Sequence, residues 1–497
     1  MTFLKDAPPK AKATAKTATV KPAAHDPLTP PALLEFMTTR WQARGNKKPP
    51  RVEGLARFVA RRKALSKRFP GELVVVPTGH EKVRANDTHY PFRPGTEFYY
   101  LTGNVEADGV LVLEPHAKGH HAVLYVEPNP GKSDSTFFTD RVKGELWVGP
   151  RLGVPESKHR YGVDECRPLR ELESSLAKVA KTAKTRVLRG YSPQVEASFK
   201  AAKGRTEEAD KELGEYLSEA RLVKDDMEIR ELERAVDSTH RGFDDVIARL
   251  GVAKSEREVE ATFFFRARTE GNDVGYGTIA ACGDHACTLH WTKNDGRVAK
   301  GDLLLLDAGV ESTTLYTADI TRTLPISGKF TREQRMVYEL VLEAQDVALE
   351  AVRPGNDFLD PNRAAMRVLA AGLVKWGILK CTVEEALDPQ KQFYRRYTLH
   401  NVSHMLGLDV HDCARARQET YKFGKLAPGM VLTVEPGLYF QRDDLTVPEK
   451  FRGIGVRIED DVLVTKTGYR NLSAAIPRAT RDVEAWMQRI WKSSKRR

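Results

Sequence analysis

The chain contains 497 residues, of which 41% are hydrophobic and 30% charged, and this length and composition are typical of a globular protein with at least two domains. The formal net charge is +11, but segments 1–26 and 492–497 carry seven of these charges, which disfavours nucleic acid as a partner. No apolar run approaches the roughly 18 residues that cross a bilayer, so we expect no membrane insertion. The absence of a secretory signal pattern, and five cysteines without a CxxC pair, predict a cytoplasmic protein without a disulfide scaffold.

The first part of the chain is predicted to form an α/β domain over residues 50–205. Residues 1–31 carry few large apolar side chains, so we expect a disordered basic arm there. Apolar periodicity predicts one basic amphipathic helix and three strands, at residues 55–69, 72–76, 109–114 and 121–127. A charged segment at residues 206–220 is expected to be a linker helix that offers little apolar surface to either side.

The second part is predicted to form an α+β domain over residues 221–490, followed by a basic tail at 491–497. One long amphipathic helix is marked by apolar residues at three- and four-residue steps: Ile229, Leu232, Val236, Phe243, Val246 and Leu250. Thr331 and Gln334 have the spacing of a capping box, so another helix is expected to begin there and to end near Pro354. Strands bounded by Gly or Pro turns are expected at residues 303–310, 316–324, 431–439 and 454–465.

Three common catalytic signatures are missing from the sequence. His80-Glu81 lacks the second histidine of an HExxH zinc motif. The segment that ends in Gly131-Lys132-Ser133 has Val126 where a phosphate-binding loop places its first glycine. No GxSxG nucleophile motif occurs. These results leave acidic residues as the candidates for chemistry.

Two of these acids lie on a predicted hairpin. Asp307 ends an apolar run, and a hairpin that turns through residues 311–314 brings Asp319 beside it. Each acid alone also fits a strand end that faces water. Because a buried carboxylate is costly without a partner, the pair favours a site that supplies positive charge.

Two further acids lie in or beside later strands. Period-two alternation places Arg457 and Glu459 on one face, and Glu435 follows an apolar strand directly before Pro436. If all four acids converge with a histidine, two divalent cations would balance their charge. Such a carboxylate-rich site suits hard ions such as Mn²⁺, and two adjacent metals activate water for hydrolysis.

A family resemblance rests on several motifs of the sequence. The second part contains the segments HNVSHMLGLDVHD at 400–412, TVEPGLY at 433–439, GIGVRIEDD at 453–461, CTLH at 287–290, DAG at 307–309 and DITR at 319–322. The first part contains ND at 86–87, YPFRP at 90–94 and YLTG at 100–103. Together they resemble aminopeptidase P, the Xaa-Pro aminopeptidases of the pita-bread metallopeptidases. The resemblance implies a creatinase-like α/β domain before an α+β pita-bread catalytic domain.

The resemblance also implies the metal ligands. Asp319 and Glu459 are expected to bridge two divalent ions, Asp307 to hold one ion, and His404 with Glu435 to hold the other. Mn²⁺ is the expected metal, with Zn²⁺ and Co²⁺ as alternatives. The step from Asp307 to Asp319 is twelve residues rather than the family's usual eleven, and we assign the extra residue to the hairpin turn or to a bulge.

The implied reaction is hydrolysis of the bond before a penultimate proline by a hydroxide that bridges the metals, with Glu435 moving the proton. The other expected site residues fall into two groups. Those expected around the scissile bond and the ligands are His290, His400, His411, Arg457 and Tyr276. Those expected to reach the substrate amine or a neighbouring subunit are Asp87 and Trp147. Burial in an ordinary core is the alternative for the histidines and for Tyr276.

Two other functions stay open at this stage. A prolidase uses the same fold and ligands on Xaa-Pro dipeptides, and a non-catalytic pita-bread protein binds partners instead. All five ligand positions are occupied, which favours an enzyme over the binding protein. The expected partners are peptides with a penultimate proline and further copies of the chain, as a homodimer or homotetramer.

Overall fold

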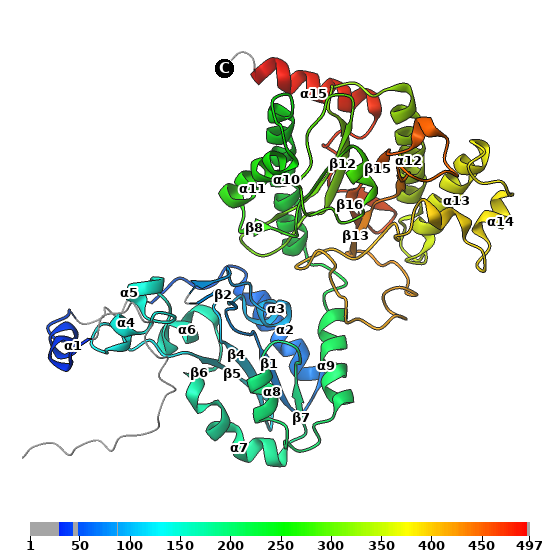
Figure 1. The fold of residues 1–497 in the computed structure, drawn as a ribbon. Helices are drawn as coiled ribbons and strands as arrows, with labels where there is room; N and C mark the ends of the chain where they lie inside the picture. The colour runs from blue at the N-terminus through cyan, green and yellow to red at the C-terminus, as the bar shows by residue number, and fades with distance from the viewer. Residues whose placement is uncertain (1–28, 43–47, 87, 495–497) are drawn as a thin grey trace, which may run out of the picture.

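The structure is a computed structural model that describes residues 29–42, 48–86 and 88–494. Figure 1 shows an amino-terminal domain and a carboxy-terminal domain, with helix α9 between them. Residues 1–28 of the predicted arm and 495–497 of the predicted tail lie outside the described residues. The rest of both segments is partly helical, because α1 begins at Pro31 and α15 continues to Ser494.

The amino-terminal domain is the predicted α/β unit. Its strands are β1 (Leu73–Pro77), β2 (Val83–Ala85), β3 (Thr88–His89), β4 (Val110–His116), β5 (Gly119–Val126), β6 (Glu165–Pro168) and β7 (Thr185–Val187). Its helices are α1 (Pro31–Thr38), α2 (Leu55–Arg68), α3 (Thr96–Thr102), α4 (Thr136–Thr139), α5 (Glu145–Val148), α6 (Val154–Tyr161), α7 (Leu172–Thr182), α8 (Pro193–Ser198) and α9 (Glu207–Glu219). The predicted helix and three strands of this domain are confirmed by α2, β1, β4 and β5.

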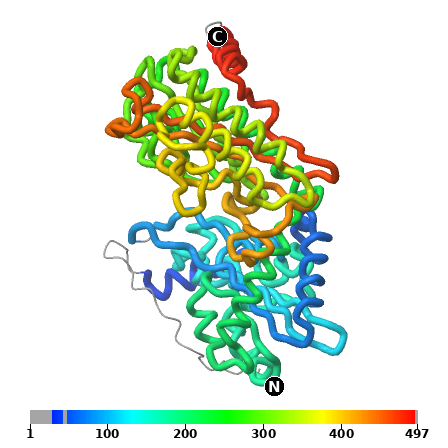
Figure 2. The backbone as a smooth tube through the Cα atoms, turned by 90° about the vertical axis from the view of Figure 1, so that its right-hand side faces the viewer, coloured from blue at the N-terminus to red at the C-terminus, as the bar shows by residue number. Residues whose placement is uncertain are grey.

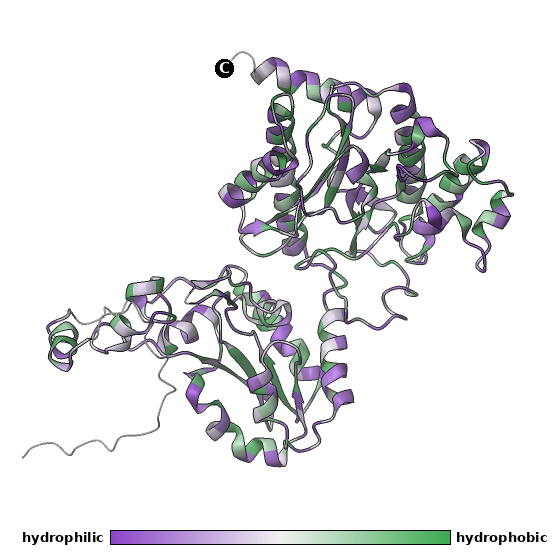
Figure 3. Ribbon diagram, viewed as in Figure 1, coloured by the Kyte–Doolittle hydropathy of each residue, from purple (hydrophilic) through white to green (hydrophobic). Residues whose placement is uncertain are grey.

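The central sheet of this domain has the strand order β6-β5-β4-β1-β7. Val74 and Val76 point to one hydrophobic core, whereas Leu73 and Val75 point to another on the opposite face. Figure 3 shows the apolar residues concentrated along these strands. Because both faces are covered, the interior strand β1 is apolar throughout rather than alternating.

Helix α9 is more than a linker. Leu213 and Leu217 are fully buried in the core shared with the central sheet. The expectation that this segment offers little apolar surface is therefore wrong, because its charged residues hide an apolar stripe four residues apart.

The carboxy-terminal domain combines helices with several small sheets. Its helices are α10 (Asp226–Leu250), α11 (Glu256–Glu270), α12 (Arg332–Ala351), α13 (Asp360–Lys375), α14 (Val383–Leu387) and α15 (Thr480–Ser494). Its strands are β8 (Asp273–Val274), β9 (Ile279–Cys282), β10 (Leu303–Ala308), β11 (Val310–Glu311), β12 (Ile320–Pro325), β13 (Val431–Val434), β14 (Gly437–Tyr439), β15 (Gly455–Arg457), β16 (Asp460–Val464) and β17 (Tyr469–Asn471).

Both long helices predicted in this domain are confirmed. The predicted apolar face of α10 is buried at Leu232, Val236 and Phe243. At the start of α12, the Gln334 backbone N–H donates to Thr331 Oγ1, and the Thr331 N–H donates to the Gln334 side chain. This is the predicted capping box.

The strands break where the acidic residues lie. The predicted strand at 431–439 is divided between β13 and β14 at Glu435-Pro436, and the strand at 454–465 is divided between β15 and β16 at Ile458-Glu459. The breaks face each other, because Val434 pairs with Asp460 and Gly437 with Arg457. Pro436 has no N–H to continue the ladder.

The segment after α14 connects the two domains in space. Figures 1 and 2 show the orange loop near residues 405–425 between the carboxy-terminal domain and the amino-terminal domain. No helix among the described residues has the length and apolarity required to span a membrane. All five cysteines are free thiols.

Candidate metal centre

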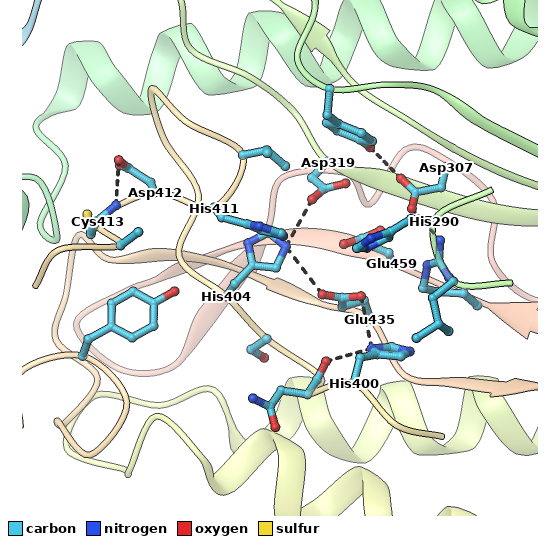
Figure 4. Close-up of a pocket in the computed structure, with 18 of the residues that line it drawn as sticks. His290, Asp307, Asp319, His400, His404, His411, Asp412, Cys413, Glu435 and Glu459 are labelled. Atoms are coloured by element: carbon cyan, nitrogen blue, oxygen red, sulfur yellow. Dashed lines mark hydrogen bonds and ion pairs between the residues drawn. The ribbon is translucent and has the colours of Figure 1, made fainter. Parts of the chain in front are cut away.

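A cavity of about 740 Å³ in the carboxy-terminal domain gathers most of the predicted site residues. Figure 4 shows acids and histidines from distant parts of the chain pointing into it. The predicted residues that line it are Tyr276, His290, Asp307, Asp319, His400, His404, His411, Glu435, Arg457 and Glu459. The structure thus brings all five predicted ligands to one place.

The hairpin of β10 and β12 supplies two of the acids. Asp307 pairs with Thr321 across the ladder, and Asp319 lies two residues before Thr321, so both carboxylates lie on one face. The predicted strand at 316–324 begins only at residue 320. The two sides of the hairpin approach closely here, since a Cβ on Gly309 would lie 1.7 Å from the carbonyl oxygen of Ala318.

The closest group in the cavity consists of Asp319, His404 and Glu459, whose ligand atoms lie within 4.8 Å of one another. His404 Nε2 is 3.2 Å from Asp319 Oδ2 and 3.5 Å from Glu435 Oε1. The segment that carries His404 runs beside β13, because the Thr433 N–H donates to the His404 carbonyl at 2.9 Å. Backbone pairing thereby holds the histidine over the acids.

Asp307 has protein partners for both carboxylate oxygens. Arg457 Nη2 lies 2.5 Å from Oδ2, and the Tyr276 hydroxyl donates to Oδ1 at 2.7 Å. Arg457 and Asp307 are both buried. Burial and the nearby charges of Asp307 and Asp319 raise the pKa of Tyr276 well above its ordinary value, so it remains a hydrogen-bond donor.

The carboxyl groups of the cavity lack enough positive charge from the protein. Burial raises the pKa of Asp307, raises that of Glu435 to about 8, and raises that of Glu459 well above its ordinary value. For Glu459, the charges of Asp319 and Glu435 act in the same direction. Burial alone would lower the pKa of His404, but its hydrogen bond with Asp319 and the charge of Glu435 raise it to about 9.

This donor set fits divalent metal ions. Four carboxylates and one imidazole in a buried cavity are costly as ions, and cations that bind oxygen ligands remove that cost. A carboxylate-rich set with one histidine suits hard or borderline ions, whereas a structural zinc site prefers thiolates.

The remaining histidines surround the acids. His400 Nε2 lies 2.8 Å from the Tyr439 hydroxyl, and its Nδ1 lies 3.4 Å from Glu435 Oε2. Burial, with the charge of Arg457, lowers the pKa of His400 to about 4, so it is neutral at pH 7. The rings of His411 and His404 are 4.4 Å apart. His290 and His411 are exposed at the edge of the cavity.

Several supporting residues were not predicted. Thr321 donates to Glu459 Oε2 at 2.6 Å, and the Asp319 N–H donates to Asp461 Oδ2 at 3.2 Å. Tyr439 joins His400 to Arg457, whose Nη1 donates to the hydroxyl at 2.9 Å. Alternation along the strand after Asp319 could have identified Thr321, whereas Tyr439 and Asp461 depend on cross-strand pairing.

The two predicted first-domain residues are Asp87 and Trp147, and Trp147 does not line this cavity. Asp87 lies outside the described residues. Trp147 lies in α5, about half exposed, and its Nε1 donates to the Phe138 carbonyl at 2.7 Å. Its predicted contact with the substrate amine gains no support within this chain, and contact with a neighbouring subunit stays a prediction.

The fold and the cavity together define a metal-dependent hydrolase with a separate amino-terminal domain. The model of metallopeptidase family M24 matches residues 230–466, and the model of the aminopeptidase P N-terminal domain matches residues 58–188. The chain belongs to the aminopeptidase P family of metallopeptidases.

Individual relatives agree with this assignment. The chain is 56% identical to Xaa-Pro aminopeptidase 1 of Streptomyces coelicolor over 434 residues, which cover 87% of each protein. It is 34% identical to the Xaa-Pro aminopeptidase of Escherichia coli, covering 86% of this chain and 97% of that one.

A solved structure of E. coli aminopeptidase P with the inhibitor Pro-Leu is similar, with a TM-score of 0.78 and 33% identity, covering 88% of this chain and 99% of that one. The predicted fold class is confirmed, with a creatinase-like α/β domain and a pita-bread catalytic domain.

Proposed function

We propose that this protein is a metal-dependent aminopeptidase that hydrolyses the bond between an N-terminal residue and a penultimate proline. The observation that carries the proposal is the convergence of Asp307, Asp319, His404, Glu435 and Glu459 on one cavity. The relatives named Xaa-Pro aminopeptidase support the choice of substrate.

We propose that these five residues hold two divalent ions, most readily Mn²⁺, with Zn²⁺ and Co²⁺ as alternatives. Asp319 and Glu459, which lie in the closest group with His404, are suited to bridge them. A solved E. coli aminopeptidase P is described as zinc-substituted, which supports the exchange of metals at such a site. When bound, the metals lower the pKa of water and polarise the substrate carbonyl.

The chain's own groups handle the protons and the positioning. Glu435 lies beside His400, whose Nδ1 is 3.4 Å from Glu435 Oε2, so its carboxylate is suited to accept a proton from the attacking water and to deliver it to the leaving proline nitrogen. Neutral His400 is hydrogen-bonded to Tyr439, and it is able to donate or accept a hydrogen bond without adding charge to the site. Arg457 fixes Asp307 through a buried ion pair.

A prolidase is the nearest alternative, and the size of the cavity favours the aminopeptidase. Its volume of about 740 Å³ is in the upper part of the roughly 300–1,000 Å³ range of drug-sized ligand sites. The lining continues past the acids to Gln418 and Lys422. There is therefore room for residues that follow the proline.

The test is a metal-dependent assay that compares the dipeptide Gly-Pro with the tripeptide Arg-Pro-Pro, together with elemental analysis of the purified protein. We expect release of arginine from Arg-Pro-Pro that chelation abolishes and Mn²⁺ restores. Strict preference for Gly-Pro would support a prolidase. Absence of hydrolysis of both peptides in the metal-loaded protein would support a non-catalytic binding protein.

Location and assembly remain parts of this proposal. Five free thiols support the predicted reducing, cytoplasmic compartment. Assembly as a homodimer or homotetramer stays a prediction that sedimentation of the purified protein would test.

A further inference from the structure

We propose that Arg93 of the amino-terminal domain is a positioning residue for the metal centre. Its guanidinium group holds together the two loops that carry the proposed metal ligands. This inference rests on the proposed function of the cavity. Arg93 lies between β3 and α3, in the segment YPFRP that the resemblance singled out. It is far from the ligands in the sequence and does not line the cavity itself.

The first loop held by Arg93 is the connection between Asp307 and Asp319. Arg93 Nε donates to Glu311 Oε2 at 2.6 Å. The other oxygen of Glu311 accepts from the Asn272 side chain at 2.8 Å, and the Glu311 side chain is almost fully buried. A buried carboxylate with both oxygens engaged fixes the loop four residues after Asp307.

The second loop held by Arg93 runs from His404 to His411. Arg93 Nη2 donates to the Leu408 carbonyl at 2.5 Å, and its Nη1 lies 3.2 Å from Asp409 Oδ1. Thr96, at the start of α3, donates to the same Asp409 oxygen at 2.7 Å. The amino-terminal domain therefore contacts this loop midway between His404 and His411.

The two loops also contact each other directly. The Thr317 N–H, two residues before Asp319, donates to the Gly407 carbonyl at 3.0 Å. Arg93 closes a ring of contacts around this hydrogen bond by binding Glu311 on the first loop and Leu408 and Asp409 on the second. The orange loop between the domains in Figures 1 and 2 is the second of these loops.

The contacts use the planar geometry of arginine. Three separate nitrogens reach three acceptors, whereas a lysine carries its charge on one nitrogen and cannot hold both loops in the same way. Loss of such a supporting group typically lowers metal affinity or activity 10- to 100-fold. We therefore expect that removal of Arg93 loosens the metal centre and does not only weaken the contact between the domains.

Arg57 offers a matched control. It also joins the two domains, since its Nε lies 3.1 Å from Oδ2 of Asp225, the residue before α10. Its side chain is 33% exposed, close to the 35% of Arg93, and Asp225 does not belong to either ligand-bearing loop. Arg93→Ala and Arg57→Ala therefore remove the same charge from the same boundary, with different neighbours.

The experiment measures Mn²⁺ binding to the metal-free full-length variants by calorimetry, kcat and KM on Arg-Pro-Pro, and the melting temperature. For Arg93→Ala we expect Mn²⁺ affinity and kcat to fall on the order of 10- to 100-fold. For Arg57→Ala we expect both to stay within about twofold of the wild type, whatever the change in melting temperature. A kcat loss larger than the KM change identifies positioning rather than substrate binding.

Wild-type Mn²⁺ affinity and kcat in Arg93→Ala, or equal losses in both variants, would overturn the proposal. If Arg93→Ala does not fold, Arg93→Lys replaces it, and the same direction with a smaller loss is expected because only one contact survives. Calorimetry decides the proposal even if the peptide assay shows no proline-directed hydrolysis, so the two failures are distinguishable.

Discussion

Arg457 and Asp307 form a buried ion pair, with Nη2 of the arginine 2.5 Å from Oδ2 of the aspartate. The side chain of Arg457 is 4% exposed and that of Asp307 is 10% exposed, so water screens this pair little. Tyr276 holds the other carboxylate oxygen. Each oxygen keeps a further lone pair, so Asp307 is orientated by protein and is still able to bind a cation.

Replacement of Arg457 by alanine should destabilise the metal-free protein. Breaking a buried pair by removing one partner typically costs about 3–5 kcal/mol, because the other charge is left uncompensated. We expect a loss of this order in the free energy of unfolding, measured by urea denaturation, and a loss of peptidase activity. Arg417→Ala is the control, because Arg417 forms an exposed pair with Glu219 and such pairs contribute about 0–1 kcal/mol. Equal losses in the two variants would contradict this explanation.

Replacement of Glu435 by alanine should separate activity from stability. This acid is the proposed proton carrier and a proposed ligand, so we expect kcat on Arg-Pro-Pro to fall by about 10²-fold or more. The metal-free protein should be as stable as the wild type, or more stable, because a buried carboxyl with a raised pKa is removed. Thermal melting of both forms and a kinetic assay measure the two effects. Retained hydrolysis would refute the role of Glu435.

The sequence-based predictions succeeded where the signal is local. The spacing of apolar residues identified the buried face of α10, and Thr331 with Gln334 identified the start of α12. The acids at strand ends were also recognisable, because a carboxylate beside an apolar run requires a partner. The motif resemblance then selected His404 among the histidines as the predicted ligand, and the structure places its Nε2 3.2 Å from Asp319 Oδ2.

Contacts between distant strands and domains were not predictable in this way. The link from His400 through Tyr439 to Arg457 depends on the pairing of β14 with β15. Arg93 and Glu311 are separated by 218 positions, and no periodicity connects them. The burial of α9 was missed because its surface charges dominate its composition.

The N-cap of α12 provides a test of the local reasoning. Thr331→Ala removes the hydroxyl that accepts the Gln334 N–H at 3.2 Å, and such a change typically costs about 1 kcal/mol. We expect this loss in the free energy of unfolding without a change in KM. Thr331→Ser keeps the acceptor and should restore most of the stability. Identical stability of the alanine and serine variants would show that the cap contributes nothing.

The acidic cavity should make stability of the metal-free protein depend on pH. Burial raises the pKa of Glu435 to about 8, above its ordinary value near 4.5. The folded protein thus binds a proton that the unfolded chain has released, and stability from this group falls as pH rises from about 4.5 through 8. His404, with a pKa raised to about 9, contributes stability below pH 6.5 that is lost as pH rises through 9.

His400 has the opposite sign, because a pKa lowered to about 4 costs stability as pH falls below 6.5. The interval from about pH 6.5 to 8 therefore isolates the acidic cavity. We expect the melting temperature of the metal-free protein to decrease over this interval. Saturating Mn²⁺ should raise the melting temperature by an amount that grows with pH, because bound cations favour the ionised carboxylates.

Glu435→Gln is the control for this titration, because it keeps the shape of the side chain and removes its proton equilibrium. The decrease in melting temperature between pH 6.5 and 8 should be smaller in this variant than in the wild type. A metal-free wild type whose melting temperature rises over the same interval would show that the carboxyl groups of the cavity are already ionised at pH 6.5. In that case the cavity would obtain its compensating charge from the protein, and the electrostatic argument for two metal ions would fail.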